Sequence, residues 1–536
     1  MKQLRFIVIL LALTAVFSTA FAQDATSLTV AFDQSQPNTL DPAAVGIADE
    51  FFVLRNVCEG LVSYDPKTLA PTPALATSWD ISSDGLTYTF HLRDGVTFSD
   101  GSKFDATAVK YTFDRLANPT TGTSYTAGLV LGSVAGWSDA RPSAPAVGQG
   151  TPTVPAPAPS DGISGVKVVD PSTVSVTLTA PKPSFLETLT LPGAYIVANG
   201  ETDFSKGPTC TGPYTVSEWT PDQQIVLKAN DSYWAGAPSV KTVTMKVIPE
   251  QSQQEVEYEA GGLDLVTVPP SDISRIQGDA TLSKQLQQVS NLTTVLFRIN
   301  LKDPVMSNVK VRQAFAAAID RETIVKTVLQ GQGEPAYGLY PPSMSAYDPN
   351  FKPFVYDPAA IKQALADAGY PDGVTLTIRT DQVEATNDVL NAIAQTAAPA
   401  GFTIKVDSTE ASVYTQDRNS CNMQLGSIIW GFDYPDPENV ATQALAGTSL
   451  SRINCGYDTL ADASDLQALN DKAAATPLGP DRDKLWQQFD QQAVGTDAAA
   501  IPVYFPTTSV LINPRVGGIP YDAQGNIQFY LIKLSS

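Results

Sequence analysis

The chain has 536 residues, is 43% hydrophobic and carries a formal net charge of −21. This length corresponds to roughly three domains, and the apolar fraction is enough for sizeable cores. A polyanion of this size is repelled by nucleic acid and by anionic membrane surfaces, so we expect no nucleic-acid partner and a preference for neutral or cationic partners.

The first 22 residues have the layout of a cleavable export signal. Lys2 and Arg5 precede an apolar run over residues 6–17, and Ala20-Phe21-Ala22 supplies the small residues of a cleavage site. The run is too short to span a membrane, which takes about 20 apolar residues. We therefore expect residues 1–22 to be removed and the mature chain to work outside the cytoplasm, as a periplasmic protein does.

The N-terminal third is predicted to combine short strands with helices. In chain order we expect a strand at 28–32, a helix at 48–61, two strands within 79–97 that flank a turn at 82–85, and a helix at 106–116. The strands are indicated by residues that alternate between apolar and polar, and the helices by apolar residues three or four positions apart.

The single histidine, His91, lies in the second of these strands. One histidine excludes an H-E-x-x-H metalloprotease and every metal site built on two histidines. The sequence also has no G-x-S-x-G nucleophile elbow and no phosphate-binding P-loop. We therefore expect no cofactor and no catalysis. A secreted hydrolase that uses the paired acids Asp433 and Asp436 is kept as a remote alternative.

Residues 139–162 are rich in Pro, Ala and Gly and contain little to bury, so we expect an extended surface loop there. Further strands are predicted at 166–178, 225–227 and 243–247. From about residue 286 onward, strands alternate with helices. The expected strands are 295–299, 374–378, 403–406 and 423–430, and the expected helices are 311–329, 358–368 and 388–398. This order indicates an α/β unit with a partly parallel sheet.

The most informative stretch is Trp430 to Pro437, which follows an apolar run over 425–429. Its two prolines stop the strand and stiffen the turn that leaves it. Aromatic walls and two acids held in a stiff turn suit a small polar ligand. An ordinary strand exit with a core Trp430 is the alternative. Because ligands of such sheets lie beyond the carboxyl ends of strands, the position favours binding.

Four cysteines remain: Cys58, Cys210, Cys421 and Cys455. An even number in an exported protein indicates disulfides, and four cysteines allow three pairings. Proximity in sequence favours Cys421–Cys455, which leaves Cys58–Cys210, while buried free thiols are the alternative. No two of the cysteines have the spacing of metal ligands, so we expect no metal site.

Short blocks along the chain match a known family in order. They are residues 40–42, 58–65, 73–79, 84–101, 211–214, 230–234, 311–321, 356–358 and 368–370. The chain thereby resembles the extracytoplasmic solute-binding proteins of the peptide/nickel class, family 5, which feed ABC importers. The resemblance covers nearly the whole mature chain, and its most specific block is 84–101.

The resemblance implies an α/β fold of two lobes, the type II, cluster C-like fold of periplasmic binding proteins, with an additional small domain. The lobes would close on a solute about a hinge. The implied limits are 23–67, 190–285 and 500–536 for a discontinuous lobe I, 68–189 for the small domain with the proline-rich loop, and 286–499 for lobe II. We expect a monomer.

The resemblance also implies site residues. In members that bind peptides, an acid in the matching segment pairs with the peptide α-ammonium, and here that acid is Asp433. Trp430 and Gly431 match positions that line the cleft, and Phe432 and Tyr434 belong to the same segment. Gly431 stands where one well-known oligopeptide binder has cysteine, and Phe432 is bulkier than the usual small residue, so the resemblance does not predict the size of the pocket.

A second segment, residues 44–47 with Val45 and Gly46, matches an N-terminal stretch near the same cleft. The implied function is capture of di- or oligopeptides and their delivery to membrane permease subunits. The alternative keeps the fold and binds an oligosaccharide or another small solute, with Trp430, Phe432 and Tyr434 stacking on sugar rings. Nickel is disfavoured, because His91 belongs to a structural strand.

Overall fold

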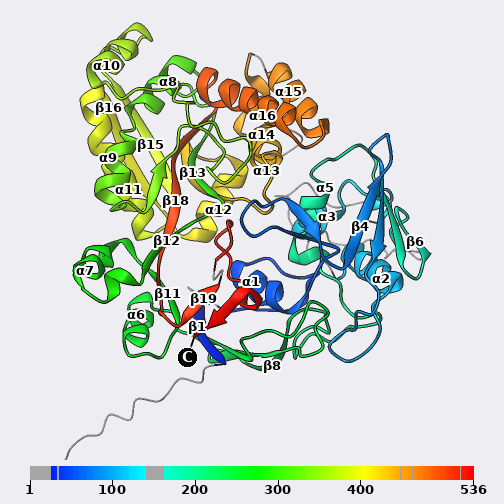
Figure 1. Ribbon diagram of the computed structural model, residues 1–536. Helices are drawn as coiled ribbons and strands as arrows, with labels where there is room; N and C mark the ends of the chain where they lie inside the picture. Colours follow the sequence, from blue (N-terminus) through cyan, green and yellow to red (C-terminus); the bar gives the residue numbers. More distant parts are fainter. Residues whose placement is uncertain are drawn as a thin grey trace, which may run out of the picture.

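The computed structural model describes residues 26–32, 36–121, 124–140, 162–446, 450–461, 463–518 and 521–535. The expected export signal at 1–22 and most of the expected loop at 139–162 lie outside these residues. Among the described helices, none is long and apolar enough to cross a membrane. Figure 1 shows the helices of residues 300–500 gathered on one side of the molecule and the N-terminal half on the other.

The first sheet has four strands in the order β1-β10-β9-β8, with β1 and β10 parallel. Their bounds are Ser27–Phe32 for β1, Thr242–Val247 for β10, Gln224–Ala229 for β9 and Tyr214–Thr220 for β8. Every second residue of β1 is buried, as its alternating sequence predicts. Helix α1 (Ala48–Val57) supplies Val53, Leu54 and Val57 to the same core. It ends earlier than the predicted 48–61, because Cys58 has extended backbone.

The second sheet builds the small domain, with strand order β4-β5-β7-β6. Its elements are β4 (Ala76–Ile81), β5 (Thr87–Leu92), β6 (Val166–Asp170), β7 (Thr173–Thr177), α2 (Ala106–Ala117) and α3 (Ser124–Leu131). The predicted hairpin at 79–97 is confirmed as β4 and β5. His91 lies in β5 with its Nε2 2.8 Å from Asp80 Oδ2 on β4, which agrees with a structural role.

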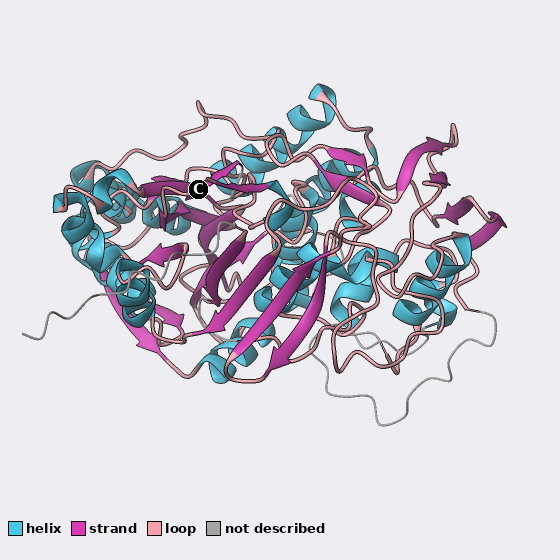
Figure 2. Cartoon of the chain, turned by 60° about the horizontal axis from the view of Figure 1, so that its bottom comes forward, coloured by secondary structure: helices cyan, strands magenta, loops and turns pink. Residues whose placement is uncertain are grey.

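The third sheet has eight strands, six of them in the order β11-β18-β13-β17-β15-β16, with β12 and β14 paired to β18. The bounds are β11 Leu265–Val268, β12 Leu286–Ser290, β13 Thr293–Ile299, β14 Gly333–Pro335, β15 Val374–Thr380, β16 Phe402–Ser408, β17 Leu425–Gly431 and β18 Ala500–Ile512. Strand β15 is parallel to β16 and β17, whereas β13 is antiparallel to β17 and β18. The prediction of a partly parallel sheet is therefore confirmed (Figure 2).

Helices surround this sheet, with α8 (Val309–Ala318), α10 (Pro358–Asp367), α11 (Glu384–Ala397) and α16 (Pro480–Asp490) as the main ones. The remaining α-helices are α4 (Trp137–Ala140), α5 (Phe185–Thr188), α6 (Gln251–Glu259), α7 (Ile273–Gly278), α9 (Arg321–Thr323), α12 (Ala411–Ser420), α13 (Glu438–Val440), α14 (Leu450–Cys455) and α15 (Ala463–Ala475). Four short strands complete the fold: β2 (Val62–Tyr64), β3 (Pro71–Pro73), β19 (Val516–Gly518) and β20 (Ile532–Leu534).

The predicted continuous helix at 311–329 is wrong. Helix α8 ends at Ala318, Ile319 has extended backbone, and Asp320 caps the next turn by accepting a hydrogen bond from Thr323 N at 3.1 Å. The buried guanidinium of Arg321 donates to carbonyl oxygens of Ala316, Ile319, Ala336 and Pro502. These tertiary hydrogen bonds stabilise the break, which helical periodicity cannot reveal.

Strand β18 has 13 residues and pairs on both sides of Pro506. Residues 500–506 pair with β13 and β14, whereas residues 507–512 pair with β12 and β11. Figure 1 shows this red strand running from the helical side of the molecule toward β11 and β19. The lobe limits remain a prediction, and β18 extends the sheet of lobe II past the expected limit at 499.

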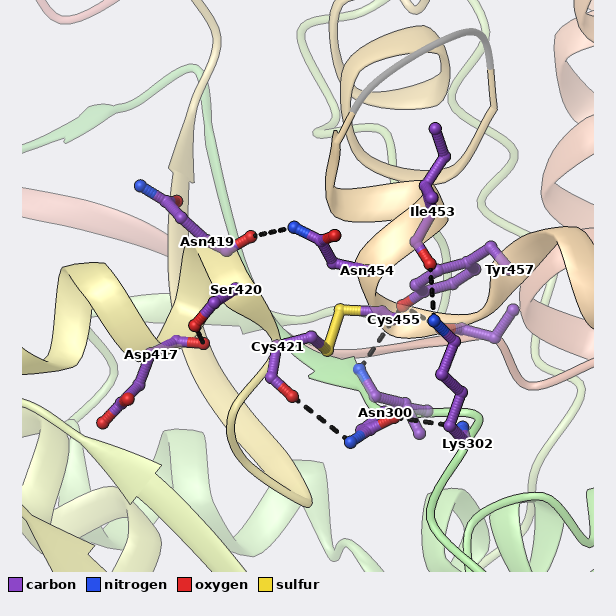
Figure 3. The surroundings of a disulfide bond; sticks show 12 residues. Asn300, Lys302, Asp417, Asn419, Ser420, Cys421, Ile453, Asn454, Cys455 and Tyr457 are labelled. Carbon is purple, nitrogen blue, oxygen red and sulfur yellow. Dashed lines mark hydrogen bonds between the residues drawn. A yellow bond between two sulfur atoms is a disulfide. The ribbon is translucent and has the colours of Figure 1, made fainter. Parts of the chain in front are cut away.

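Both favoured disulfides are confirmed. Cys58 is bonded to Cys210, Cys421 is bonded to Cys455, and no cysteine is free. Around the second bridge, Asn300 Nδ2 donates to Cys421 O at 3.3 Å, and Asn454 Nδ2 donates to Asn419 O at 2.8 Å (Figure 3). In the chain-entropy model, a loop of that length contributes roughly 4 kcal/mol to stability.

Candidate functional site

The segment predicted as the binding turn begins where β17 ends, at Gly431. The half-buried Trp430 donates its indole N–H to Asn439 Oδ1 at 3.0 Å, and Asn439 Nδ2 donates to Asp433 Oδ2 at 3.0 Å. Asn439 is completely buried, whereas Asp433 is only half-buried. One buried amide thus fixes both Trp430 and the carboxylate of Asp433 at the carboxyl end of the strand.

The second acid of the turn, Asp436, has a different role. It is 2% exposed and receives two hydrogen bonds from Arg482, Nη1 to Oδ2 at 2.6 Å and Nη2 to Oδ1 at 2.9 Å. It also accepts a hydrogen bond from Glu438 N at 2.8 Å. A two-point ion pair of this kind holds a buried carboxylate firmly. Asp436 therefore anchors the turn to α16 and leaves Asp433 as the acid that solvent reaches.

The two rings predicted for the site lie in cores. Phe432 is 7% exposed and belongs to the core of lobe II. Tyr434 is 2% exposed and packs in the core of the small domain, the same cluster as Ala43 and Phe185. The ammonium group of Lys182 lies 5.9 Å from the centre of the Tyr434 ring. Both rings therefore serve packing in this conformation, and Trp430 is the aromatic residue of the turn that remains partly exposed.

In the N-terminal segment at 44–47, the surface next to the expected cleft is formed by backbone atoms more than by side chains. Val45 is completely buried, and its carbonyl oxygen accepts a hydrogen bond from Thr126 Oγ1 at 3.3 Å. Gly46 is exposed, and its N–H donates to Glu50 Oε2 at 2.7 Å. A Cβ at Gly46 would meet no atom within 4 Å, and one at Gly431 would meet only Thr293 Oγ1 at 4.0 Å. Both glycines therefore face open space.

Contacts with the small domain bring further carboxyl groups to the turn. Ser184 donates its hydroxyl to Glu438 Oε2, and Glu187 lies close enough to Asp436 and Arg482 to interact electrostatically. Burial, and then the charge of Asp436, raises the pKa of Glu187. One arginine thus faces several acids where the small domain meets lobe II, next to the apolar contact made by Tyr434.

The sequence analysis predicted none of the cavities of the structure, and two of them have charged side chains and are larger than 150 Å³. One, of about 290 Å³, lies between α1, β11, the β12–β13 junction and the C-terminal tail, and its lining includes Phe52, Arg55 and Asn291. The other, of about 160 Å³, lies in lobe II and is lined by Asp490 and several aromatic residues. A sequence signal for the second exists in α16, where Trp486, Phe489 and Asp490 follow Arg482 at helical spacing on the buried face.

Comparison with known proteins agrees with this architecture. Residues 70–451 match the model of a family described as bacterial extracellular solute-binding proteins, family 5. Heme-binding protein A of Haemophilus influenzae is 27% identical over 493 residues, which cover 89% of this chain and 86% of that protein. The dipeptide-binding protein of Escherichia coli is 28% identical over 491 residues, 88% of this chain and 87% of that protein.

Solved structures show the same fold. The structure of HbpA2 from Haemophilus parasuis superposes with a TM-score of 0.78 at 25% identity and covers 95% of this chain and all of that one. The family match spans well over half of the sequence, and the relatives are matched over most of their length. The chain therefore belongs to the bacterial extracellular solute-binding proteins of family 5 and has their two-lobed α/β fold.

Proposed function

We propose that this protein captures peptides in the cleft between its lobes and delivers them to the membrane permease subunits of an ABC importer, acting as a monomer and without catalysis. The observation that carries the proposal is the position of Asp433. It stands at the carboxyl end of β17, is held by a buried amide, and follows the exposed Gly431. The relative named as a dipeptide-binding protein supports peptide as the cargo.

In this proposal the α-ammonium of the peptide pairs with Asp433. Trp430 covers the first residue of the peptide, and the open space at Gly431 and Gly46 leaves room for its backbone. A hydrogen bond to a charged group contributes roughly 1.5–3 kcal/mol. Closure of the lobes would then remove the pair from water, which strengthens it further.

The test is Asp433→Asn, measured by titration calorimetry with trialanine and with N-acetyl-trialanine. The variant keeps an oxygen that accepts the hydrogen bond from Asn439 but loses the charge. We expect about ten- to hundredfold weaker binding of trialanine, which corresponds to the free energy of one such bond. The acetylated peptide has no ammonium group and should be affected much less.

Asp481→Asn is the matched control, because the side chain of Asp481 is 93% exposed and its one ion pair within the described part of the chain is with Lys484, three residues further on. We expect it to bind both peptides as the wild type does. Equal trialanine affinity of the wild type and Asp433→Asn would remove Asp433 from the site.

A second cargo class is favoured by one observation: the heme-binding relative is as similar to this chain as the dipeptide-binding one. Thermal-shift screening of purified protein against peptides, oligosaccharides and hemin separates these ligands, because a bound ligand raises the melting temperature. A shift with hemin or a sugar and none with peptides would overturn the peptide proposal and leave the family assignment intact.

A further inference from the structure

The cavity of about 160 Å³ in lobe II has walls of an unusual composition. It lies where β14 and the following loop meet β18 and the end of α16. Its aromatic residues are Tyr337, Tyr340, Tyr347, Phe351 and Phe505, and its charged residues are Glu322, Glu334, Asp348, Asp490 and Lys352. Acidic groups thus outnumber basic ones four to one among aromatic rings, a combination that suits a cation.

Asp490 is the most deeply buried acid of this cavity, with 7% of its surface exposed. Its two oxygens lie 3.0 and 3.2 Å from Leu339 N, and it forms no ion pair among the residues that the structure describes. A Cβ at Gly338 would lie 2.1 Å from Asp490 Oδ2, so the glycine lets the carboxyl group reach the backbone. Burial, and to a smaller extent the charge of Asp348, raises the pKa of Asp490 to about 8, although the hydrogen bond from Leu339 N lowers it.

Tyr340 gives a second, independent indication of a ligand. It lines the same cavity and is 1% exposed, yet its hydroxyl has no hydrogen-bond partner among the described residues. A buried hydroxyl without a partner costs about 1–3 kcal/mol. The group is therefore placed to bond to something that enters the cavity.

The wall of the cavity already contacts cationic side chains of the protein itself. The guanidinium of Arg321 lies 5.2 Å from the centre of the Tyr337 ring, and the ammonium of Lys352 lies 5.0 Å from it. Within the described part of the chain, no group of three or more His, Cys, Asp and Glu side chains converges as a metal site requires. The carboxylates of this cavity are separated by aromatic side chains and do not converge on one point, which favours an organic cation over a metal ion.

We propose that this cavity is a binding site for an organic ammonium or guanidinium group, with Asp490 as its counter-ion, the Tyr340 hydroxyl as an acceptor and the aromatic rings as walls. The volume fits one such head group and its nearest methylenes, because sites for whole small ligands are usually about 300 Å³ or more. Binding would keep Asp490 ionised by supplying the charge that the fold lacks around it.

The cavity adjoins the strand next to the proposed peptide anchor. Thr294 of β13 donates its hydroxyl to Leu339 O at 2.8 Å, and Thr294 is the partner of Trp430 in the β13–β17 register. We consider a basic side chain of a bound peptide as one source of the cation, and this source rests on the proposed function. A free amine is the other source and does not depend on it.

Titration calorimetry with three probes separates these sources: Ala-Lys-Ala, Ala-norleucine-Ala and n-butylammonium. Norleucine keeps the carbon chain of lysine without its charge. If a peptide side chain is bound, the wild type binds Ala-Lys-Ala at least tenfold tighter than the norleucine peptide, and Asp490→Asn removes this advantage. If a free amine is bound, n-butylammonium binds the wild type at least tenfold tighter than the variant, and the peptides do not differ.

Asp481→Asn is the matched control, because it makes the same change at an exposed position of the same helix. It should retain every preference of the wild type. If neither the lysine advantage nor n-butylammonium binding depends on Asp490, the proposal is overturned. Asp433→Asn should weaken both peptides alike, so failure of the peptide anchor is distinguishable from failure of this site.

Tyr340→Phe provides a second test of the site that does not depend on the folding of Asp490→Asn. This variant removes only the hydroxyl, and we expect it to bind the preferred cationic probe about threefold or more weakly than the wild type. Unchanged affinity for that probe, in a variant with an unchanged circular dichroism spectrum, would overturn the site.

Discussion

Helix α16 buries a charged side chain near each end, Arg482 in its first turn and Asp490 at its last residue. Arg482 meets Asp436 in a two-point ion pair, and this acidic partner contributes to raising the pKa of its guanidinium. Among the described residues, Asp490 accepts hydrogen bonds from a backbone N–H and forms no ion pair, and burial raises its pKa to about 8. A buried ion pair is costly to break, because the remaining charge has no partner, whereas burial of an unpaired acid favours its protonated form.

The largest effect on stability is expected from removing Arg482, the ion-pair partner of Asp436 in the first turn of α16. Arg482→Met leaves Asp436 buried without a counter-ion, which should cost about 3–5 kcal/mol of the free energy of unfolding. Urea unfolding followed by tryptophan fluorescence measures this loss. The exposed Asp481→Asn should change the same quantity by less than about 0.5 kcal/mol. Wild-type stability of Arg482→Met would show that the ion pair does not anchor the turn.

The protonation of Asp490, at the last residue of α16, is tested by the dependence of stability on pH. The folded pKa of Asp490 is about 8, above its usual 3.8, so the folded state keeps a proton that the unfolded state releases. This contribution to stability is complete below about pH 4 and is lost as the pH rises toward 8, at a limit of about 1.4 kcal/mol per pH unit. In Asp490→Asn this slope should be absent.

Melting temperatures of the two proteins between pH 5 and 8 provide the measurement. Glu187 adds a slope of the same sign in both proteins, because burial also raises its pKa, so the difference between the proteins reports Asp490 alone. Parallel curves would mean that Asp490 is ionised in the folded state.

The smallest effect concerns the hydroxyl beside Asp490. Tyr340→Phe removes a buried oxygen that has no partner among the described residues, so stability should stay the same or rise by up to about 1 kcal/mol. Urea unfolding again supplies the measurement. A loss of more than about 1 kcal/mol would show that the hydroxyl stabilises the protein and is not reserved for a ligand.

Much of the fold could be predicted from the sequence, because local patterns determine it. The alternation in β1 and β5 and the apolar run of β17 locate these strands, and the blocks that carry the family resemblance locate structural contacts. Glu59 of one block, for example, accepts hydrogen bonds from Thr211, Tyr233 and Trp234 of two others. Such blocks reveal the family because they hold the lobe together.

The rest depends on contacts between distant residues, which local patterns do not contain. The break at Ile319 is stabilised by carbonyl groups up to 181 residues away from Arg321. The burial of Phe432 and Tyr434 depends on two different cores, so their aromatic character alone suggested ligand contact. Asp490 was missed because a single acid in a helix is usually exposed. Its burial depends on the distant loop whose Leu339 N donates a hydrogen bond to it.

The core around β1 is closed by residues from the opposite end of the chain. Phe529 and Ile532 pack with Leu28 and Val30, and Phe529 N donates to Asn56 Oδ1 at 2.8 Å. A protein that works outside the cytoplasm crosses the membrane before it matures, and the core of lobe I cannot be completed until residues 529–532 have emerged. Lobe II, whose core draws mainly on residues 292–504, can fold earlier. The core of lobe I is therefore complete only when both ends of the chain are present.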